Sequence, residues 1–398
     1  MHLRKSVALF LLSVSACLAA QAQTTEILTS NGDGTHGYVG GAGLAIDSLG
    51  NVYAAGLSNS NVFKITPGGA ITQIMDASGD GTHALDRAQG LAVDSSDNVY
   101  VTGQFSNNVF RIADPGAGNC NTGGSPCAIT QIMDASGDGN GNTLDTPLAV
   151  VADAGGNIYV GGGFGSDNVF KIDTPGSCST GGTPCTITQI MDASGDGTHT
   201  LSQVGALGID NAGDVLVVGY ASDNVFRIDT PTSCSTGGTP CAISQIIGSD
   251  GDGGGNILDF PRFVAVDGAG SVYVTGYFSE NVFQITSGGT ITEITAASRP
   301  IGLGIDNGGN LFVAESTANV VTRIAALASP STCSTGGSAC PSTTVIDATG
   351  DGGSGTMSAP GTIAVRDAAV VVNAFTTDNV LKAIQISVIF ADGFDGPP

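Results

Sequence analysis

Three kinds of side chain in this sequence recur at spacings that could support chemistry: acids, cysteines and histidines. Among the acids, the segment Asp-Ala-Ser-Gly-Asp-Gly occurs at 76–81, 134–139 and 192–197. Oxygen-bearing side chains at alternate positions, followed by a glycine, match the first six positions of a calcium-binding loop. The candidate calcium ligands in these segments are Asp76, Ser78, Asp80, Asp134, Ser136, Asp138, Asp192, Ser194 and Asp196.

The bidentate acid that completes a calcium loop stands eleven residues after the first aspartate, and only one copy has it. Asp145 occupies that position after Asp134, whereas the other two copies have Arg87 and Gln203. The alternative interpretation is a turn between strands, in which the Asp and Ser side chains satisfy backbone amides without a metal. Calcium is therefore the candidate cofactor. Because two of the three copies lack the completing acid, the sequence favours the metal-free turn over a calcium site.

Eight of the nine cysteines form four pairs, each with six residues between its two members. The pairs are Cys120/Cys127, Cys178/Cys185, Cys234/Cys241 and Cys333/Cys340. Zinc sites usually have a shorter gap and need two pairs to converge. An even number of cysteines in an exported chain is typical of disulfides. We therefore predict four local disulfides, with zinc as the alternative.

Histidine chemistry is restricted to a few positions. His36, His83 and His199 share the context Gly-Asp-Gly-Thr-His, and the fourth histidine, His2, lies at the N-terminus. Equivalent positions in different repeats predict separate surface turns rather than one metal site. Glu280 and Glu315 do not recur, so they are the acids to inspect for an enzyme, whose site has to be asymmetric.

A longer unit that recurs seven times must position these side chains. Its first strand ends at an anchor residue, and the anchors are Asp47, Asp94, Asp153, Asp210, Asp267, Asp306 and Arg366, spaced by 47, 59, 57, 57, 39 and 60 residues. After each anchor come a turn, a strand such as Asn98–Thr102 and a triplet such as Asn108-Val109-Phe110. Repeats of this length made of short strands are typical of β-propellers, with one blade per repeat.

We therefore predict an all-β fold: a seven-bladed β-propeller with four antiparallel strands in each blade. The anchor aspartates should cap turns, and each cysteine loop should join the third strand of a blade to the fourth. Five phenylalanines recur at one position and should lie in the core between blades: Phe63, Phe110, Phe170, Phe226 and Phe283.

Closure of the ring has two candidate strands. Residues 25–29, followed by Asn31-Gly32-Asp33-Gly34, match a fourth strand with its linker but have no first three strands before them. We expect this N-terminal strand to complete the last blade and to hide its edge. Residues 386–390 are the alternative, and residues 391–398 are expected to form a C-terminal tail.

The N-terminus indicates export. Arg4 and Lys5 precede an apolar run, and Ala20-Gln21-Ala22 fits a cleavage site, so residues 1–22 read as a signal peptide and 23–390 as one propeller domain. The alternative is a lipoprotein anchored through Cys17, because Val14-Ser15-Ala16-Cys17 resembles a lipobox. We expect a secreted, periplasmic or cell-envelope protein of bacterial type, with no membrane span.

Charge limits the partners. Removal of residues 1–22 leaves 10 basic and 35 acidic residues, a formal charge of −25. This charge repels phosphate backbones, so we expect no nucleic-acid partner, and we expect a monomer. The sequence has no tryptophan and its tyrosines fall mostly in strands, which disfavours a carbohydrate-binding platform.

The repeat resembles the NHL repeats of bacterial secreted β-propellers. Residues 79–101, 137–160, 195–217 and 251–274 carry the likeness, in the form Gly-Asp-Gly, a loop, then Gly-x-Ala-Val-Asp-x-x-Gly-Asn-Val-Tyr-Val. The cysteine loops and the Asn-Val-Phe triplet depart from the usual unit. The resemblance implies a binding or scaffolding role, although lactonase-like and lyase-like relatives are enzymes, and a fold alone does not choose between them.

The sequence therefore favours an exported, non-catalytic binding or scaffold module that engages a protein or a surface ligand through its loop face. The alternative is a metal-dependent propeller enzyme of the lactonase or lyase type. A purely structural surface protein is a third class.

Overall fold

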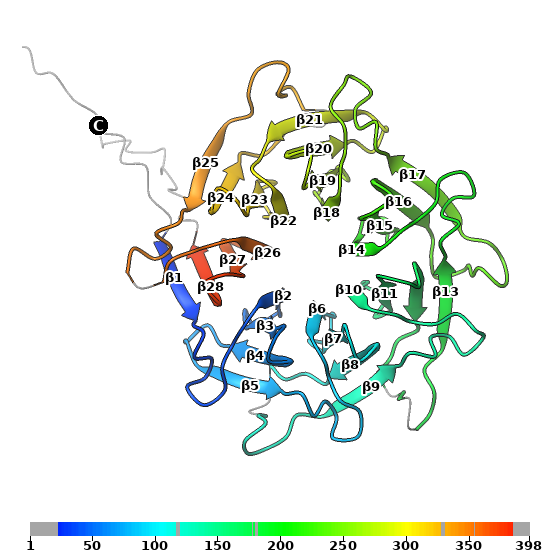
Figure 1. The fold of residues 1–398 in the computed structure, drawn as a ribbon, viewed down its shortest axis with the longest axis vertical. Coiled ribbons are helices and arrows are strands. Elements are labelled where there is room, and N and C mark those ends of the chain that lie inside the picture. Colours follow the sequence, from blue (N-terminus) through cyan, green and yellow to red (C-terminus); the bar gives the residue numbers. More distant parts are fainter. Residues whose placement is uncertain are drawn as a thin grey trace, which may run out of the picture.

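The computed structural model describes residues 23–116, 120–176, 178–179, 182–327, 331–353 and 355–384. These residues form seven four-stranded sheets that stand as blades around a central axis (Figure 1). The predicted seven-bladed β-propeller is confirmed. The signal peptide 1–22, Cys17, the alternative strand 386–390 and the tail 391–398 lie outside the described residues.

The strands form four concentric layers. The innermost strands are β2 (Gly41–Ile46), β6 (Ala88–Val93), β10 (Pro147–Ala152), β14 (Val204–Ile209), β18 (Pro261–Val266), β22 (Pro300–Ile305) and β26 (Pro360–Arg366). The second strands are β3 (Val52–Gly56), β7 (Val99–Gly103), β11 (Ile158–Gly162), β15 (Val215–Gly219), β19 (Val272–Gly276), β23 (Leu311–Glu315) and β27 (Ala369–Ala374).

The third strands carry the Asn-Val-Phe triplets or their equivalents. They are β4 (Asn61–Ile65), β8 (Asn108–Ile112), β12 (Val169–Ile172), β16 (Asn224–Asp229), β20 (Asn281–Ile285), β24 (Val320–Ile324) and β28 (Asn379–Ile384). The outermost strands are β5 (Ile71–Met75), β9 (Ile129–Met133), β13 (Ile187–Met191), β17 (Ala242–Ile247), β21 (Ile291–Ala296), β25 (Ser342–Ile346) and β1 (Gln23–Leu28).

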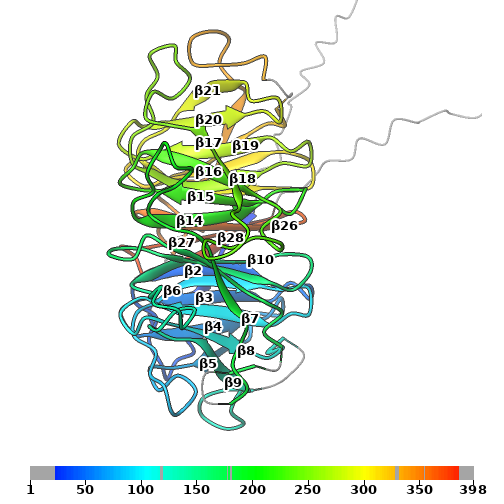
Figure 2. The same ribbon diagram turned by 90° about the vertical axis from the view of Figure 1, so that its right-hand side faces the viewer.

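The molecule is a disc whose strands run between two faces (Figure 2). On one face, the linker face, lie the turns between second and third strands and the linkers from one blade to the next. On the other, the cysteine face, lie the turns between first and second strands and the loops that leave the third strands. No helix in the described ranges is long and apolar enough to cross a membrane.

The core lies between neighbouring blades, as the recurring phenylalanines predicted. Phe63, Phe110, Phe170, Phe226 and Phe283 are all fully buried. Four linker glycines, Gly32, Gly79, Gly195 and Gly251, lie close to one of these rings. A Cβ built on Gly79 would be 3.0 Å from Phe110 Cζ and 1.9 Å from the carbonyl oxygen of His83. Gly79 also has φ +65°, so the linker turn requires glycine at this position.

The N-terminal strand closes the ring, as predicted. β1 pairs antiparallel with β28, with Gln23 opposite Ile384, and so becomes the fourth strand of the seventh blade. Three side-chain bonds support the closure. Asn379 Nδ2 donates to Glu26 Oε1 at 2.8 Å, Asp378 Oδ1 accepts the Gly40 N–H at 2.7 Å, and Asn373 Nδ2 donates to the carbonyl of Ala42.

Candidate functional site

The candidate calcium residues lie in the linkers, where their side chains make turn hydrogen bonds. Asp76 Oδ1 accepts the backbone N–H of Ser78 at 2.8 Å and its hydroxyl at 2.5 Å. The same pair of bonds joins Asp134 to Ser136 and Asp192 to Ser194. These are short side-chain-to-backbone turns of the kind that compete with metal binding for the same oxygens.

The second aspartate of two of the three segments, Asp80 and Asp196, bonds the linker to an outermost strand, and Asp33 does the same in the first linker. Asp80 Oδ1 accepts the N–H groups of Thr82 and His83, and its Oδ2 lies 3.0 Å from His83 Nδ1. Asp80 Oδ2 also accepts the N–H of Gln131 in β9 at 3.2 Å. In the first, second and fourth blades, the preceding linker therefore caps the exposed edge of the outermost strand.

These contacts change the acidity of the aspartates. Partial burial by itself raises the pKa of Asp33, Asp80 and Asp196, because it disfavours the charged form. Hydrogen bonds from the histidine, from the turn backbone and from the outermost strand outweigh burial and hold each pKa below the usual 3.8. The three carboxylates are thus structural acceptors that are charged at neutral pH.

The acid that would complete a calcium loop lies against another turn. A Cβ built on Gly165, between β11 and β12, would be 2.7 Å from Asp145 Oδ2, so this carboxylate packs there. Across the described residues, no three His, Cys, Asp or Glu side chains are grouped so as to hold a metal ion. Of the three repeated segments, the one with Asp134, Asp138 and Asp145 has the most acids in calcium-loop positions. Calcium binding there stays a prediction.

All four predicted disulfides are present in the structure. Cys120–Cys127, Cys178–Cys185, Cys234–Cys241 and Cys333–Cys340 have Cα atoms 4.7 to 4.9 Å apart. Each pair lies in the loop between the third and fourth strands of its blade, as the repeat predicted. The zinc alternative is wrong, because each cysteine is bonded to its own partner. Such disulfides are typical of compartments outside the reducing cytoplasm.

Each cysteine loop with a described tip reaches back to the preceding blade. The N–H of Thr236 donates to the carbonyl of Gln189 in β13 at 3.0 Å, and the Thr236 hydroxyl donates to Gln189 Oε1 at 2.6 Å. Thr122 makes both contacts with Gln73 in β5, and the Thr335 N–H donates to the Glu293 carbonyl in β21. The loops therefore occupy backbone acceptors that an edge strand would otherwise expose.

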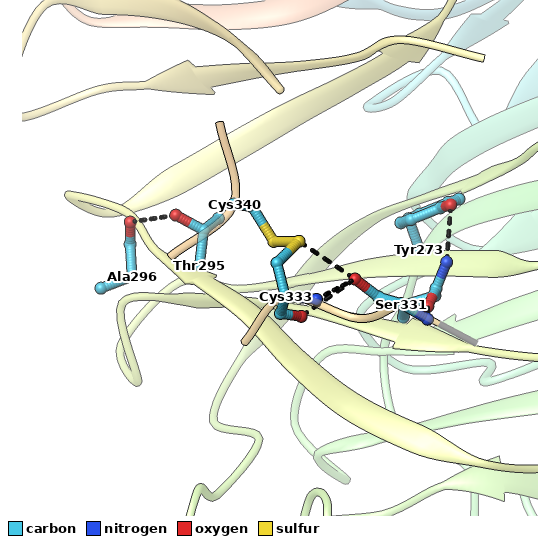
Figure 3. Close-up of a disulfide and its surroundings, with 7 residues drawn as sticks. Tyr273, Thr295, Ala296, Ser331, Cys333 and Cys340 are labelled. Atoms are coloured by element: carbon cyan, nitrogen blue, oxygen red, sulfur yellow. Dashed lines mark hydrogen bonds between the residues drawn. A yellow bond between two sulfur atoms is a disulfide. The ribbon is translucent and has the colours of Figure 1, made fainter. Parts of the chain in front are cut away.

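Figure 3 shows the fourth disulfide and its link to the core of the fifth blade. Ser331 lies beside Cys333, and its N–H donates to Gln284 Oε1 at 2.8 Å. Gln284 Nε2 in turn donates to the Tyr273 hydroxyl at 2.9 Å. A continuous chain of hydrogen bonds thus joins this loop to a buried tyrosine of the neighbouring blade.

The anchor aspartates cap turns on the cysteine face, as expected. Asp47 Oδ1 accepts the N–H groups of Leu49 and Asn51, while Oδ2 accepts from Asn51 Nδ2 and the Tyr53 hydroxyl. The contact raises the pKa of Tyr53, first through burial and then through its bond to the carboxylate. These carboxylates therefore act as structural acceptors in the turns.

The two non-repeated acids lie on the linker face, outside the central channel. Glu315 accepts the Ser298 N–H through Oε2 at 2.9 Å and the Thr322 hydroxyl through Oε1 at 2.6 Å, so it fixes a linker. Glu280 is exposed at a position where the other blades carry Ser60, Asn107, Asp167, Asp223, Asn319 and Asp378. Neither glutamate lines the channel.

The central channel holds a cavity of about 200 Å³ between the innermost strands. Most of its lining side chains are small or aliphatic, such as Leu91, Leu148 and Ala206, and several lining residues are glycines. Tyr220, Arg262 and Phe263 interrupt this lining on one side. Arg262 and Phe263 have no counterparts in the other blades, and Tyr277 of blade five holds the repeat position of Tyr220. The asymmetry that a specific site requires is therefore concentrated at blades four, five and six.

A cluster of rings and guanidinium groups surrounds that side of the channel on the linker face. We call it the aromatic–arginine patch, and it consists of Tyr220, Phe260, Arg262, Tyr277, Phe278 and Arg299. The Phe260 ring centroid lies 5.3 Å from that of Tyr220 and 5.0 Å from that of Phe278. The centroids of Tyr277 and Phe278 are 5.0 Å apart. The side chain of Phe278 is 54% exposed.

Sequence reasoning missed this patch, which comes from turns and strand starts of three blades. Tyr220 and Tyr277 lie in second-to-third-strand turns, and Phe260 and Arg299 directly precede innermost strands. A signal was available in the position before each innermost strand, where the chain carries Gly40, Arg87, Thr146, Gln203, Phe260, Arg299 and Ala359. This position varies while its neighbours repeat.

Comparisons with known proteins agree with the fold. A model of a β-propeller repeat, SBBP, matches residues 34–64 and 71–111, in the first two blades. No curated protein sequence matches the chain significantly. Virginiamycin B lyase from Staphylococcus aureus is similar in structure, with a TM-score of 0.62 and 15% identity over 92% of this chain and 100% of that one.

Two further solved structures are similar. One is a catalytically inactive histidine-to-alanine variant of the same lyase with quinupristin, at 14% identity and a TM-score of 0.62, covering 92% and 100% of the two chains. The other is the extracellular domain of a proposed one-component system from Bacteroides thetaiotaomicron, at 15% identity and 0.57, covering 90% and 42%. At these identities the likeness shows the fold alone; with the repeat match, it shows that the chain is built of β-propeller repeats.

Proposed function

We propose that this protein is an exported, non-catalytic binding module that engages a protein or a surface ligand through its linker face. The observation that carries the proposal is the aromatic–arginine patch, which breaks the repeat at the channel mouth and leaves Phe278 half exposed. Exposed aromatic and arginine side chains are enriched where proteins bind partners. The four disulfides and the N-terminal segment support export.

The distribution of other exposed rings points to the same face. Phe105, Phe164 and Phe375 lie in the second-to-third-strand turns of three other blades and are 50 to 54% exposed. On the cysteine face, the large apolar side chains that are exposed in the described residues are Leu49 (58%) and Ile384 (47%), and neither is aromatic. Apolar surface grouped on one face is typical of an interaction surface.

The fold similarity to virginiamycin B lyase makes the enzyme alternative testable. In that lyase a histidine-to-alanine variant is inactive. Here His36, His83 and His199 lie on linkers, each with Nδ1 3.0 Å from an aspartate oxygen, and none lines the channel. This placement favours binding over lyase chemistry at the channel mouth.

Site-specific photo-cross-linking tests the proposed function. A photoreactive phenylalanine analogue is placed at Phe278 in one variant and at Leu49 in a matched variant, and each is exported from the native host. We expect a cross-linked adduct from position 278 alone. An excess of protein without the photoreactive group should suppress this adduct, whereas the same excess of the variant Tyr277→Ser/Arg299→Ser should not. Equal adducts from both positions, or none, would contradict the proposal. Cleavage of quinupristin by the purified protein with Mg²⁺ or Ca²⁺ would establish the enzyme alternative.

A further inference from the structure

The aromatic–arginine patch places positive charge on a strongly acidic protein. The mature chain has only ten basic residues, and two of them, Arg262 and Arg299, lie in this patch. In the described part of the chain, neither guanidinium group makes an ion pair or a hydrogen bond; their contacts are with aromatic rings. The chain has 35 acidic residues, so the absence of a carboxylate partner for these two arginines among the described residues is unexpected.

The arginines of the third strands show that the fold can supply acceptors. Arg111 donates to Asn98 Oδ1 at 2.9 Å, Arg323 donates to Asn310 Oδ1 at 2.7 Å, and Arg227 lies 3.3 Å from Asp210 Oδ2. Each of these three has one terminal nitrogen, Nη2, held by an acceptor of its own blade. The arginines that lie over aromatic rings therefore differ from those of the third strands. Arg87 is held over a single ring outside the patch, whereas Arg262 and Arg299 share one cluster of rings.

Three aromatic rings surround the guanidinium of Arg262. Its Cζ atom lies 4.8 Å from the Tyr220 centroid, 5.6 Å from that of Phe260 and 5.5 Å from that of Tyr277. The Arg299 Cζ atom is 5.5 Å from the Tyr277 centroid, so both cations contact one tyrosine. A guanidinium held over aromatic rings keeps its N–H edge free for a planar anion.

The backbone around the patch is shaped for these side chains. A Cβ on Gly205 would lie 1.6 Å from Tyr220 Cε1, so the tyrosine ring covers β14 only because residue 205 is glycine. Asp223 Oδ1 accepts the Phe260 N–H at 2.8 Å and fixes its strained backbone, which has φ +52°. The short linker from β21 to β22 brings Arg299 to the same rim.

We infer that the patch binds a ligand that carries a carboxylate beside an aromatic or apolar group; this inference rests on the proposed function of the linker face. A carboxylate is planar and can accept two N–H bonds from one guanidinium. The exposed ring of Phe278 offers a surface on which the adjoining group can stack. Asp223, Asp259 and Glu280 belong to the same rim, and their charges oppose a dianion such as phosphate more strongly than a monoanion.

Such a carboxylate could come from a free acid or from the C-terminal residue of a peptide. Calorimetry with the mature protein separates these sources and tests the chemistry. The probes are 3-phenylpropanoate, its amide, a pentapeptide ending in phenylalanine with a free or an amidated C-terminus, and inorganic phosphate. We expect each acid to bind at least about tenfold more tightly than its amide, and binding to weaken in salt. Tighter binding of the peptide acid than of the free acid would assign a protein C-terminus.

Three variants locate the site. Arg299→Met and Arg262→Met should each weaken binding of the acids by about tenfold or more, because each removes a charged donor. Arg87→Met is the matched control: Arg87 holds the same repeat position as Arg299 and lies 4.4 Å over the Phe105 ring, but it is outside the patch. It should leave binding unchanged. Thermal melting of each variant separates loss of the site from loss of the fold.

Several results would overturn the inference. Equal affinity for acid and amide, equal loss in Arg87→Met, or phosphate affinity that matches the carboxylates would each exclude a carboxylate site at the patch. If position 278 still cross-links to a partner in such a case, the proposed function stands and only the ligand class is wrong. If neither carboxylate binding nor cross-linking is observed, both proposals fail.

Discussion

At the scale of single residues, Gly205 decides where Tyr220 lies. Any side chain at position 205 would overlap the tyrosine ring, because a Cβ there would come within 2.0 Å of three ring atoms. Tyr220 is partly exposed and can swing outward, so Gly205→Ala should displace the ring with little loss of stability. The guanidinium of Arg262 would then lose one of its three aromatic neighbours.

This expectation is checked by the NMR signals of labelled tyrosine. Gly205→Ala should shift the Tyr220 ring signals and weaken carboxylate binding several-fold, while the melting temperature stays close to that of the native sequence. Gly237→Ala is the control, since a Cβ on Gly237 meets no atom within 4 Å. Unchanged Tyr220 signals in Gly205→Ala would show that the ring does not lie over β14.

Asp80 gives a second prediction, about acid stability. Its pKa is lower in the folded protein than the usual 3.8, so its charge stabilises the fold above about pH 4 and this contribution is lost as pH falls below that value. Asp80→Asn removes charged acceptors for His83 and Gln131. We expect it to lower the free energy of unfolding at pH 7 by about 1–3 kcal/mol.

The variant should also be less sensitive to acid than the native sequence. Urea unfolding at pH 7, 4 and 3 measures this, and the difference between the two proteins should shrink toward pH 3. The control is Asp86→Asn, because Asp86 is an exposed linker aspartate whose side chain makes no hydrogen bond or ion pair within the described residues. A constant difference across the three pH values would refute the structural role assigned to the charge.

At the scale of elements, the cysteine loops protect the outermost strands. The edge of β5 illustrates this: the Gln73 N–H donates to Asp33 Oδ2 at 3.3 Å, and its carbonyl accepts from Thr122 at 3.1 Å. A linker covers the donor and a disulfide loop covers the acceptor, so a foreign strand finds no free pair of groups there. Two repeated motifs that resembled ligand sites thus have a shared structural purpose.

Removal of one disulfide tests this role. Cys234→Ser/Cys241→Ser should lower the free energy of unfolding by about 2–3 kcal/mol, the value for closure of a short loop. It should also increase aggregation on heating, because the Thr236 contacts with Gln189 in β13 are no longer held. Thr236→Val keeps the backbone donor and loses only the hydroxyl bond, so its cost should be about 0.5–1.5 kcal/mol. Differential scanning calorimetry and light scattering measure both effects; an equal aggregation rate would contradict the protective role.

The elements were predictable from the sequence, whereas the patch was not. Asn224-Val225-Phe226 and its six counterparts mark the third strands because β-branched and aromatic residues recur there at one spacing. The contacts of Phe260 with Tyr220 and of Arg299 with Tyr277 instead depend on how far the blades rotate about the axis, which no local pattern encodes. The departures from the repeat at positions such as 260 and 299 were visible, but they become a site only when three blades are placed side by side.

At the scale of the whole molecule, the ring depends on a strand from the opposite end of the chain. β1 supplies the fourth strand of the last blade, and Glu26 accepts a hydrogen bond from Asn379 across the join. Asp378 and Asn373 complete the contact between the seventh blade and the first. Because the first and last blades are joined in this way, unfolding of either should open the ring and expose β28 as an edge.

Deletion of residues 23–28 should therefore destabilise the whole ring, although the segment is short. Without β1, the outward backbone groups of β28 are free, and two molecules can pair through them. We expect a lower melting temperature and concentration-dependent association in size-exclusion chromatography with light scattering. Deletion of 385–398 is the matched control for loss of a terminus, and it should leave both properties close to those of the mature protein. If the C-terminal deletion destabilises the protein more than loss of β1, then residues 386–390 contribute to closure and the N-terminal strand is not the main clasp.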